Sequence, residues 1–273
     1  MCVSNLHRHD EGVSRRGFLK AGAAAALGAA ATVAGPAAPV MASRGKRDRI
    51  ADLTHVFAEG FPMYVGPNPV AQPLATFEED GFYSQLWTIA EHSGTHVDVP
   101  GHFVEGNRLA HQLTPDELMA PLAVIDISDR AAGDPDAAVT VADIRGYERR
   151  YGRIPRGALV CEYSGWEVRV GDEAAYRNTG PDGLFHFPGF SGESVEFLLD
   201  RRQITGIGVD TLSLDIGAST TFEVHVTLLG ADRFGVENMA NLSGVPPSGA
   251  TVFVGLVPWE NGSGGPCRAI ATW

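Results

Sequence analysis

The sequence predicts one domain of the α/β class over residues 50–273. Short apolar runs typical of buried strands alternate there with segments typical of helices. No linker divides the region into halves, and no internal repeat or low-complexity tract follows residue 42. A region of this length is long enough to build one large hydrophobic core.

Six runs with strand character lie in this region: 50–54, 82–90, 122–127, 158–161, 204–209 and 251–257. Between residues 61 and 73, four prolines predict an extended loop that carries aromatic side chains. The segment 143–151 is typical of a helix, and Pro155 and Gly157 break the chain after it. The amphipathic segment 194–201 predicts a second helix, with Ser191 as its N-cap.

Composition excludes several classes of protein. The chain has 273 residues with 21 Lys and Arg against 33 Asp and Glu, a net charge of −12. Four of these basic and two of these acidic residues fall in the first 42, so the remaining 231 residues carry 17 and 31, or −14. This charge disfavours binding to nucleic acid or to an anionic membrane. Three cysteines rule out a disulfide scaffold, although one Cys161–Cys267 bridge stays open.

The first 42 residues predict a signal peptide, followed by a linker over 43–49. Paired arginines in Ser14–Lys20 precede an uncharged, alanine-rich run over 21–34, and small residues close the segment at Val40-Met41-Ala42. The pattern resembles a twin-arginine export signal, which is an address and not an anchor. A transmembrane helix is the alternative, but the run is too short and too rich in alanine. We therefore expect an exported protein, periplasmic or extracellular, without a membrane anchor.

Nine histidines occur, two of them in the first 42 residues, and three of the other seven lie in the window 92–102. The window reads His-Ser-Gly-Thr-His-Val-Asp-Val-Pro-Gly-His, and its valines and proline disfavour a helix. In an extended chain, His96 and Asp98 point to the same face. Gly94 can bend His92 toward them, and a turn at Pro100-Gly101 precedes His102.

Four metal-capable groups in one segment predict part of a divalent-metal site, and imidazole and carboxylate ligands without thiolates suit zinc or manganese. The alternative is a polar turn whose histidines cap neighbouring carbonyls. One segment rarely closes such a site, and the best candidates for further ligands are His225 and Glu237. Periodicity does not select these two residues, and each taken alone fits a surface or capping position better than a ligand position.

The window resembles the hallmark His-x-Gly-Thr-His-x-Asp-x-Pro-x-His of the metal-dependent cyclase superfamily, which includes bacterial kynurenine formamidases and isatin hydrolases. Other parts of the chain are similar to this family in the same order. They are Asp52-Leu53-Thr54, the stretch Gly208–Asp215, His225 with Leu228-Leu229, Glu237-Asn238 with Asn241-Leu242, and the ending Gly262–Ala269. The chain departs from many members at Tyr163-Ser164-Gly165-Trp166, where they have Arg-Thr-Gly-Trp.

The resemblance implies the swivelling β/β/α architecture of this superfamily and a homo-oligomer, either a homodimer or a homotetramer. It implies that the metal ligands are His92, His96, Asp98, His225 and Glu237. It also implies an acid/base role for His102 beside the metal. Five such ligands can hold two Zn²⁺ or Mn²⁺ ions if one carboxylate bridges them.

This site predicts a metal-dependent amidohydrolase in which a hydroxide formed at the metal attacks a carbonyl. The expected substrate is an aryl-formamide or a cyclic amide, as in the arylformamidases that convert N-formylkynurenine to kynurenine in tryptophan catabolism. The alternatives are an isatin or lactone hydrolase on the same scaffold and a secreted, non-catalytic metal- or solute-binding protein. A serine hydrolase is disfavoured, because the chain has no Gly-x-Ser-x-Gly motif.

Aromatic residues are candidate walls of a pocket for an aromatic substrate, with core or loop packing as the alternative for each. They are Phe57, Phe61, Tyr64, Trp87 and Phe190. Spacing ties none of the histidines His55, His111 and His186 to the cluster, so we interpret them as structural.

Overall fold

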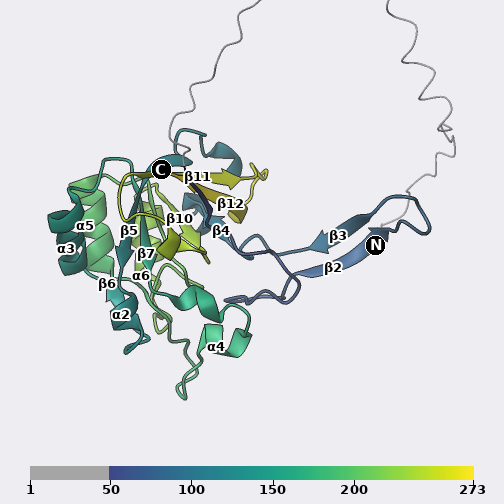
Figure 1. The fold of residues 1–273 in the computed structure, drawn as a ribbon, viewed down its shortest axis with the longest axis horizontal. Helices are drawn as coiled ribbons and strands as arrows, with labels where there is room; N and C mark the ends of the chain where they lie inside the picture. The colour runs from purple at the N-terminus through teal and green to yellow at the C-terminus, as the bar shows by residue number, and fades with distance from the viewer. Residues whose placement is uncertain (1–48) are drawn as a thin grey trace, which may run out of the picture. The chain divides into compact units, whose positions relative to one another are not determined.

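The structure is a computed structural model that describes residues 49–273 (Figure 1). The predicted signal peptide over 1–42 and residues 43–48 of the predicted linker lie outside the described residues.

Seven strands close into a barrel. Their order is β12 (Gly264–Thr272), β11 (Ala250–Leu256), β5 (Met119–Asp126), β7 (Leu159–Tyr163), β9 (Gly206–Gly208), β10 (Phe234–Glu237) and β4 (His96–Asp98). The circle closes because β4 pairs with the start of β12 as well as with β10. An eighth strand, β1 (Ile50–Asp52), pairs with the end of β12. Closure pairs the backbone groups that an open sheet would leave free at its edges.

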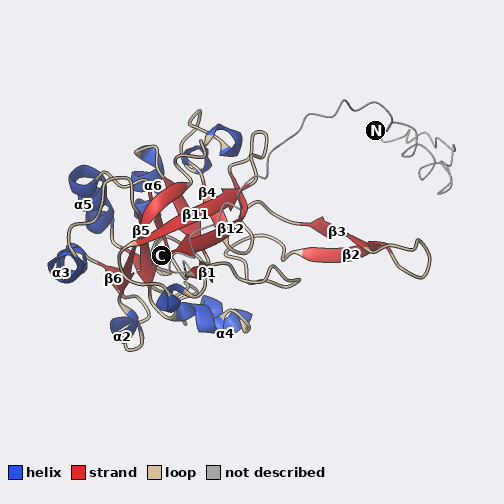
Figure 2. Ribbon diagram, turned by 45° about the horizontal axis from the view of Figure 1, so that its top comes forward, coloured by secondary structure: helices blue, strands red, loops and turns tan. Residues whose placement is uncertain are grey.

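One part of the barrel is parallel and is covered by helices. Strands β5, β7, β9 and β10 run parallel, and the other pairings around the barrel are antiparallel. Helices α3 (Val141–Tyr151), α5 (Gly192–Arg202) and α6 (Glu223–Gly230) lie in the connections between the parallel strands. Figure 2 shows α3 and α5 on the side of the barrel away from β2 and β3.

Successive side chains of a parallel strand serve two different cores. On β5, Leu122 and Val124 point into the barrel, whereas Ala123 and Ile125 pack against the helices. This alternation follows from the period of two in a strand. Because both faces are buried, these strands are continuous apolar runs in the sequence.

Shorter elements complete the fold. They are the helices α2 (Ser128–Ala131) and α4 (Glu173–Arg177), the paired strands β6 (Ala138–Val139) and β8 (Gly189–Phe190), and four 3₁₀ turns at Pro100–His102, Ala110–Gln112, Trp166–Arg169 and Leu242–Gly244.

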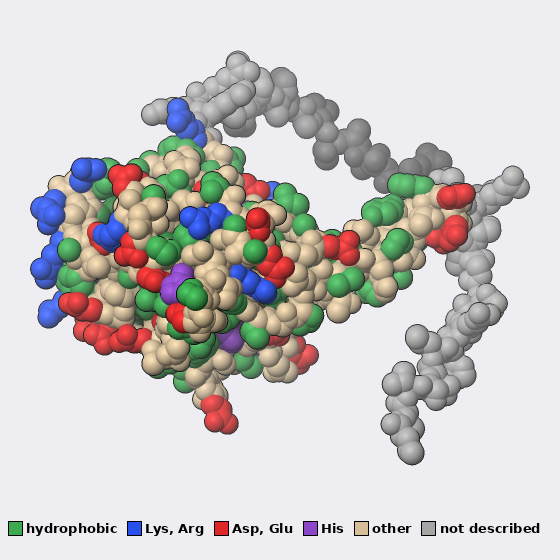
Figure 3. All heavy atoms as spheres, turned by 90° about the horizontal axis from the view of Figure 1, so that it is seen from below, with side chains coloured by type: hydrophobic (Ala, Val, Ile, Leu, Met, Phe, Trp, Pro, Cys, Tyr) green, Lys and Arg blue, Asp and Glu red, His purple; other side chains and the backbone are tan. Residues whose placement is uncertain are grey.

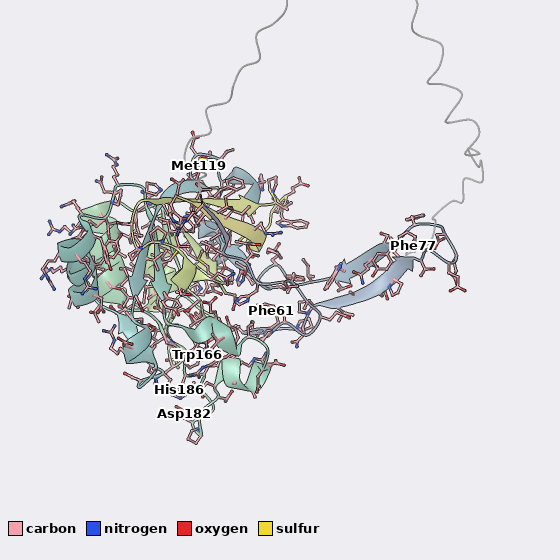
Figure 4. All side chains as sticks on the ribbon, viewed as in Figure 1. Phe61, Phe77, Met119, Trp166, Asp182 and His186 are labelled. Atoms are coloured by element: carbon pink, nitrogen blue, oxygen red, sulfur yellow. The ribbon has the colours of Figure 1, made fainter. Side chains whose placement is uncertain are left out.

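A two-stranded hairpin, β2 (Val70–Ala75) and β3 (Ser84–Thr88), projects from the barrel and pairs with no other strand of the described residues. Figure 3 shows hydrophobic side chains along it and acidic side chains at its end. In Figure 4, Phe61 lies where the hairpin joins the barrel and Phe77 lies near its far end. Phe77 is 73% exposed.

The structure confirms the α/β class and a strand in each of the six predicted runs. Both predicted helices are present, and the Ser191 side chain caps α5 as expected. Helix α3 begins two residues earlier than predicted, because Thr140 and Asp143 form a capping box. The predicted loop over 61–73 is wrong at its end, where β2 begins at Val70.

Both described cysteines, Cys161 and Cys267, are buried free thiols, so the bridge that the sequence left open is absent. None of the helices within residues 49–273 has the length and hydrophobicity that a membrane span requires.

Candidate metal centre

The short strand β4 and the bend before it present the first three predicted ligands. His96 and Asp98 lie two residues apart on it, and both are buried. Gly94 has φ +65°, and a Cβ there would lie 2.5 Å from the ring of Phe57, so this sharp bend requires glycine. The bend returns His92 to the strand, with its Nδ1 2.6 Å from Asp98 Oδ1.

Pairing of β4 with β10 adds Glu237. His96 lies directly opposite Glu237 in the antiparallel register, which places both side chains on one face. The distance from His96 Nε2 to Glu237 Oε2 is 3.3 Å. His225, on α6, places its Nε2 3.1 Å from Glu237 Oε1 and 3.2 Å from Asp98 Oδ2.

The five side chains therefore form two groups that share one carboxylate. The first group is His92, His96 and Asp98, and the second is Asp98, His225 and Glu237. Asp98 uses Oδ1 toward the first group and Oδ2 toward the second. This is the arrangement in which one carboxylate can bridge two ions.

Each of the three imidazoles uses its remaining nitrogen for an outer hydrogen bond. His96 Nδ1 lies 2.9 Å from the carbonyl oxygen of Gly94. His225 Nδ1 lies 2.6 Å from Asp215 Oδ2, and His92 Nε2 lies 3.0 Å from Ser263 Oγ. Outer partners of this kind fix the orientation and tautomer of a metal-binding imidazole.

The charges within the cluster compensate one another. Burial alone would lower the pKa of His96, but the carboxylates of Asp98 and Glu237 raise it to about 10. Burial opposes ionisation of Asp98 as well, yet the three imidazoles hold the pKa of its carboxyl well below the usual range. The pKa of His225 is raised despite its burial, because Asp215, Asp98 and Glu237 surround it. The cluster thus holds protons at positions that a cation could take.

The donor set fits a divalent metal ion. His96 Nε2 is buried and has no hydrogen-bond partner within residues 49–273, although Asp98 Oδ1 and Glu237 Oε2 each lie 3.3 Å away. A bound cation would give this nitrogen its missing partner. The set contains imidazole and carboxylate and no thiolate, which suits zinc or manganese.

His102 stands beside the cluster without belonging to either group. His102 ends the 3₁₀ turn Pro100–His102 that follows β4. Its imidazole ring stacks on that of His92, with centroids 3.9 Å apart and planes inclined by 26°. Burial lowers the pKa of His102 below its ordinary value. The ring of Phe103 stacks on that of His225, with centroids 4.7 Å apart, and the ring centroid of Phe222 lies 5.9 Å from that of His225.

Of the five aromatic residues predicted as pocket walls, only Tyr64 lines the cavity at the cluster. This cavity, of about 40 Å³, is also bordered by Pro62, Val65, His92, His96, Leu212, Glu237 and Asn238. The prediction for Phe190 is wrong, because its side chain is 2% exposed and packs between the sheet and the helices.

The other three do not line this cavity. Phe57 packs edge-on against Trp87, with centroids 5.5 Å apart, behind the bend at Gly94. Phe61 is buried against the ring of His55. In each case local packing accounts for the aromatic side chain.

The remaining histidines lie outside the cluster. His186 forms ion pairs with Asp136 and Asp182, and His111 accepts a hydrogen bond from the backbone of Asn261. His55 is largely buried, and burial lowers its pKa.

Sequence reasoning missed four residues that contact the predicted ligands: Phe103, Asp215, Phe222 and Ser263. Asp215 and Ser263 lie in stretches that resemble the family, so the motif signal could have found them. Nothing in the local pattern identifies the two phenylalanines.

Residues 51–216 match the family described as "Putative cyclase". The chain therefore belongs to the cyclase family of metal-dependent hydrolases, as the histidine-rich motif indicated. Isatin hydrolase of Roseibium aggregatum is 32% identical over 243 residues, which cover 81% of this chain and 90% of that protein.

Solved structures agree with this assignment. Isatin hydrolase A of Ralstonia solanacearum superposes with a TM-score of 0.79 at 32% identity, covering 82% of this chain and 92% of that chain. An isatin hydrolase bound to the product analogue thioisatinate gives 0.80 at 30% identity, covering 83% and 92%.

Proposed function

We propose that this protein hydrolyses the amide C–N bond of a cyclic aryl amide of the isatin type, with the five clustered side chains holding two divalent ions. The observation that carries the proposal is the pair of ligand groups joined through Asp98, with His102 stacked beside them. The similarity to isatin hydrolases over most of both chains favours a cyclic amide over an open-chain aryl-formamide.

Divalent ions bound there would polarise the substrate carbonyl and acidify a water molecule. The protein's own part is to hold the ligands in place. The carbonyl oxygen of Gly94 accepts from His96 Nδ1–H, and Asp215 accepts from His225 Nδ1–H, so each ring would present its Nε2 lone pair to an ion that displaces the Nε2 proton.

His102 is the proposed proton carrier. It is near both ligand groups, with its ring 3.9 Å from that of His92 and 6.2 Å from that of His225. As general base it takes a proton from the attacking water, and as general acid it gives one to the leaving nitrogen. Such a role contributes about 10²- to 10⁴-fold to the rate.

Aromatic side chains beside the cluster suit a flat, fused-ring substrate. Phe222 lies 5.7 Å from Phe103 and 5.9 Å from Tyr64, so the three rings form a continuous wall. Aromatic rings favour stacked and edge-on contacts with other rings, which a planar aryl amide can make.

A substrate panel tests the proposal. Purified protein loaded with Mn²⁺ or Zn²⁺ is assayed on isatin, N-formylkynurenine and a simple aryl lactone, and its metal content is measured in parallel. We expect the highest kcat/KM on isatin. A preference for N-formylkynurenine would make the protein an arylformamidase, and two bound ions without turnover of any substrate would leave a metal-binding protein.

We further propose that the protein is exported, which the paired arginines Arg15 and Arg16 and the alanine-rich run after them support. Fractionation of expressing cells tests this. The wild type should be found in the periplasm or medium, and an R15K/R16K variant should stay in the cytoplasm.

The hairpin supports a homodimer as the proposed assembly. Its large apolar side chains are exposed: Val70, Leu74, Phe77, Phe82, Tyr83, Leu86 and Trp87. An aromatic side chain buries about 150–250 Å², so four half-exposed rings offer roughly 400 Å² per chain. This is about half of the ~800 Å² per partner in a standard interface, and the aliphatic residues add to it. Light scattering should report a dimer for the wild type and monomer for L74S/F77S; a monomeric wild type would refute the dimer.

A further inference from the structure

The start of β12 is shaped around one side of the His92 ring. Ser263 Oγ lies 3.0 Å from His92 Nε2. A Cβ on the next residue, Gly264, would lie 2.6 Å from His92 Cε1, so only glycine lets the chain pass so close to the ring. This segment is the Gly262-Ser263-Gly264 motif, which has no role in the proposed reaction.

Ser263 also binds a carboxylate. Its hydroxyl donates to Glu91 Oε2 at 2.6 Å, and its backbone N–H donates to the same oxygen at 2.9 Å. A serine hydroxyl has one proton to give. Because Glu91 takes that proton, Ser263 Oγ accepts from His92, and His92 therefore carries its proton on Nε2. Nδ1 is then the nitrogen that would bind an ion of the first ligand group, in place of its present 2.6 Å contact with Asp98 Oδ1.

The second ligand group is supported differently. Asp215 accepts directly from His225 Nδ1 at 2.6 Å, and it also accepts from the backbone N–H of Val224 at 2.8 Å. Asp215 is buried, whereas Glu91 is exposed and reaches its histidine only through a hydroxyl. The two groups share Asp98 but have separate outer supports.

We propose that Ser263 and Glu91 are positioning residues that orient His92 and so set the affinity of the first ligand group for its ion, leaving the second group to Asp215. This inference rests on the proposed two-ion centre. It predicts that each outer support can be removed with an effect on one ion only.

Isothermal titration calorimetry of the metal-free protein with Mn²⁺ measures the affinities of the two ions without any substrate. Ser263→Ala should weaken one of the two ions by about 10- to 100-fold and leave the other unchanged. Glu91→Gln should weaken the same ion by less. The double variant should lose no more than Ser263→Ala alone, because Glu91 acts through Ser263. Asp215→Asn should weaken the other ion.

Ser128→Ala is the matched control. The Ser128 hydroxyl donates to Asp126 at 2.6 Å, as Ser263 does to Glu91, but it contacts neither ligand group. This variant should bind both ions as the wild type does, and thermal unfolding of all the metal-free variants checks that they are folded. If Glu91→Gln destabilises the protein, Ser263→Ala still tests the inference. If Ser263→Ala destabilises it, Glu91→Gln tests the inference instead.

The possible failures can be told apart. A wild type that binds no Mn²⁺ refutes the metal centre and the inference together. A wild type that binds two ions while Ser263→Ala binds both unchanged, or weakens both equally, overturns the positioning role alone.

Discussion

Two clusters of buried ionisable side chains lie in this protein, and they hold their charges in opposite ways. In the metal centre, imidazoles surround Asp98 and lower the pKa of its carboxyl. In the second cluster, Glu162 near the end of β7 and Asp210 after β9 have no imidazole from residues 49–273 beside them. Burial raises the pKa of Asp210 to about 6, and burial together with Asp210 raises that of Glu162.

The difference shows what a buried carboxylate needs in order to bind a cation. The metal centre contains negative oxygens held ready by groups that can release protons. In the second cluster the carboxyl of Glu162 is held in its neutral form, and both of its oxygens lack hydrogen-bond partners among the described residues. The carboxylate of Asp210 instead accepts hydrogen bonds from the backbone N–H groups of Ser164, Gly165 and Trp166.

The largest expected effect is that of removing the shared carboxylate. Asp98→Asn should abolish binding of both ions and reduce turnover below detection, because both ligand groups lose a charged oxygen. Elemental analysis and the substrate panel measure this outcome. Retention of two ions by this variant would contradict the role of Asp98 as a shared ligand, which distinguishes this cluster from the second one.

Next comes His102, which is near the cluster but outside both ligand groups. His102→Ala should keep the bound metal and lose about 10²- to 10⁴-fold in kcat, since only proton transfer is removed. Metal content and kcat are measured on the same preparation. Unaltered activity would take His102 out of the reaction.

The second cluster should respond in stability and not in metal content. Asp210→Asn should destabilise the protein by about 1–3 kcal/mol at pH 7.5, because the amide offers one acceptor oxygen where the carboxylate offers two. Urea unfolding measures the loss, and metal analysis serves as the control. Loss of an ion from this variant would mean that the two clusters are not independent.

The smallest effect concerns the pH dependence of stability. Because the folded pKa of Glu162 is raised, the folded protein keeps a proton that the unfolded chain releases above pH ~4.5. The contribution of Glu162 to stability is therefore fullest at low pH and falls as pH rises. Glu162→Gln removes this dependence, so its stability relative to the wild type should rise between pH 5 and 6, by at most about 1.4 kcal/mol for one proton. Urea unfolding at both values checks this, and a difference that stays constant with pH would contradict it.

Local patterns were sufficient where one segment fixes its own geometry. The bend at Gly94, the shared face of His96 and Asp98, and the turn before His102 could all be predicted, and the structure contains each. The Thr140–Asp143 capping box is also a local pattern, and it identifies the start of α3 two residues before the predicted one.

Other features could not be read locally. A strand pattern does not reveal its partner, so nothing local predicts that β10 pairs with β4 and places Glu237 opposite His96. An aromatic residue suits a core as well as a pocket, which is why the prediction for Phe190 was wrong. Strand β2, with its exposed and apolar residues, has no alternation that marks it as a hairpin strand.

By itself, the sequence determined the α/β class, the six predicted strands and two helices, and the half of the candidate metal centre that lies between His92 and His102. It offered His225 and Glu237 as candidates, and only resemblance to a family assigned them as ligands. Tertiary structure alone decided that Asp98 is shared by both groups, and that Ser263 is the outer partner of His92. The physical reason is that these contacts join residues more than 100 positions apart, and only closure of the barrel brings them within hydrogen-bonding distance.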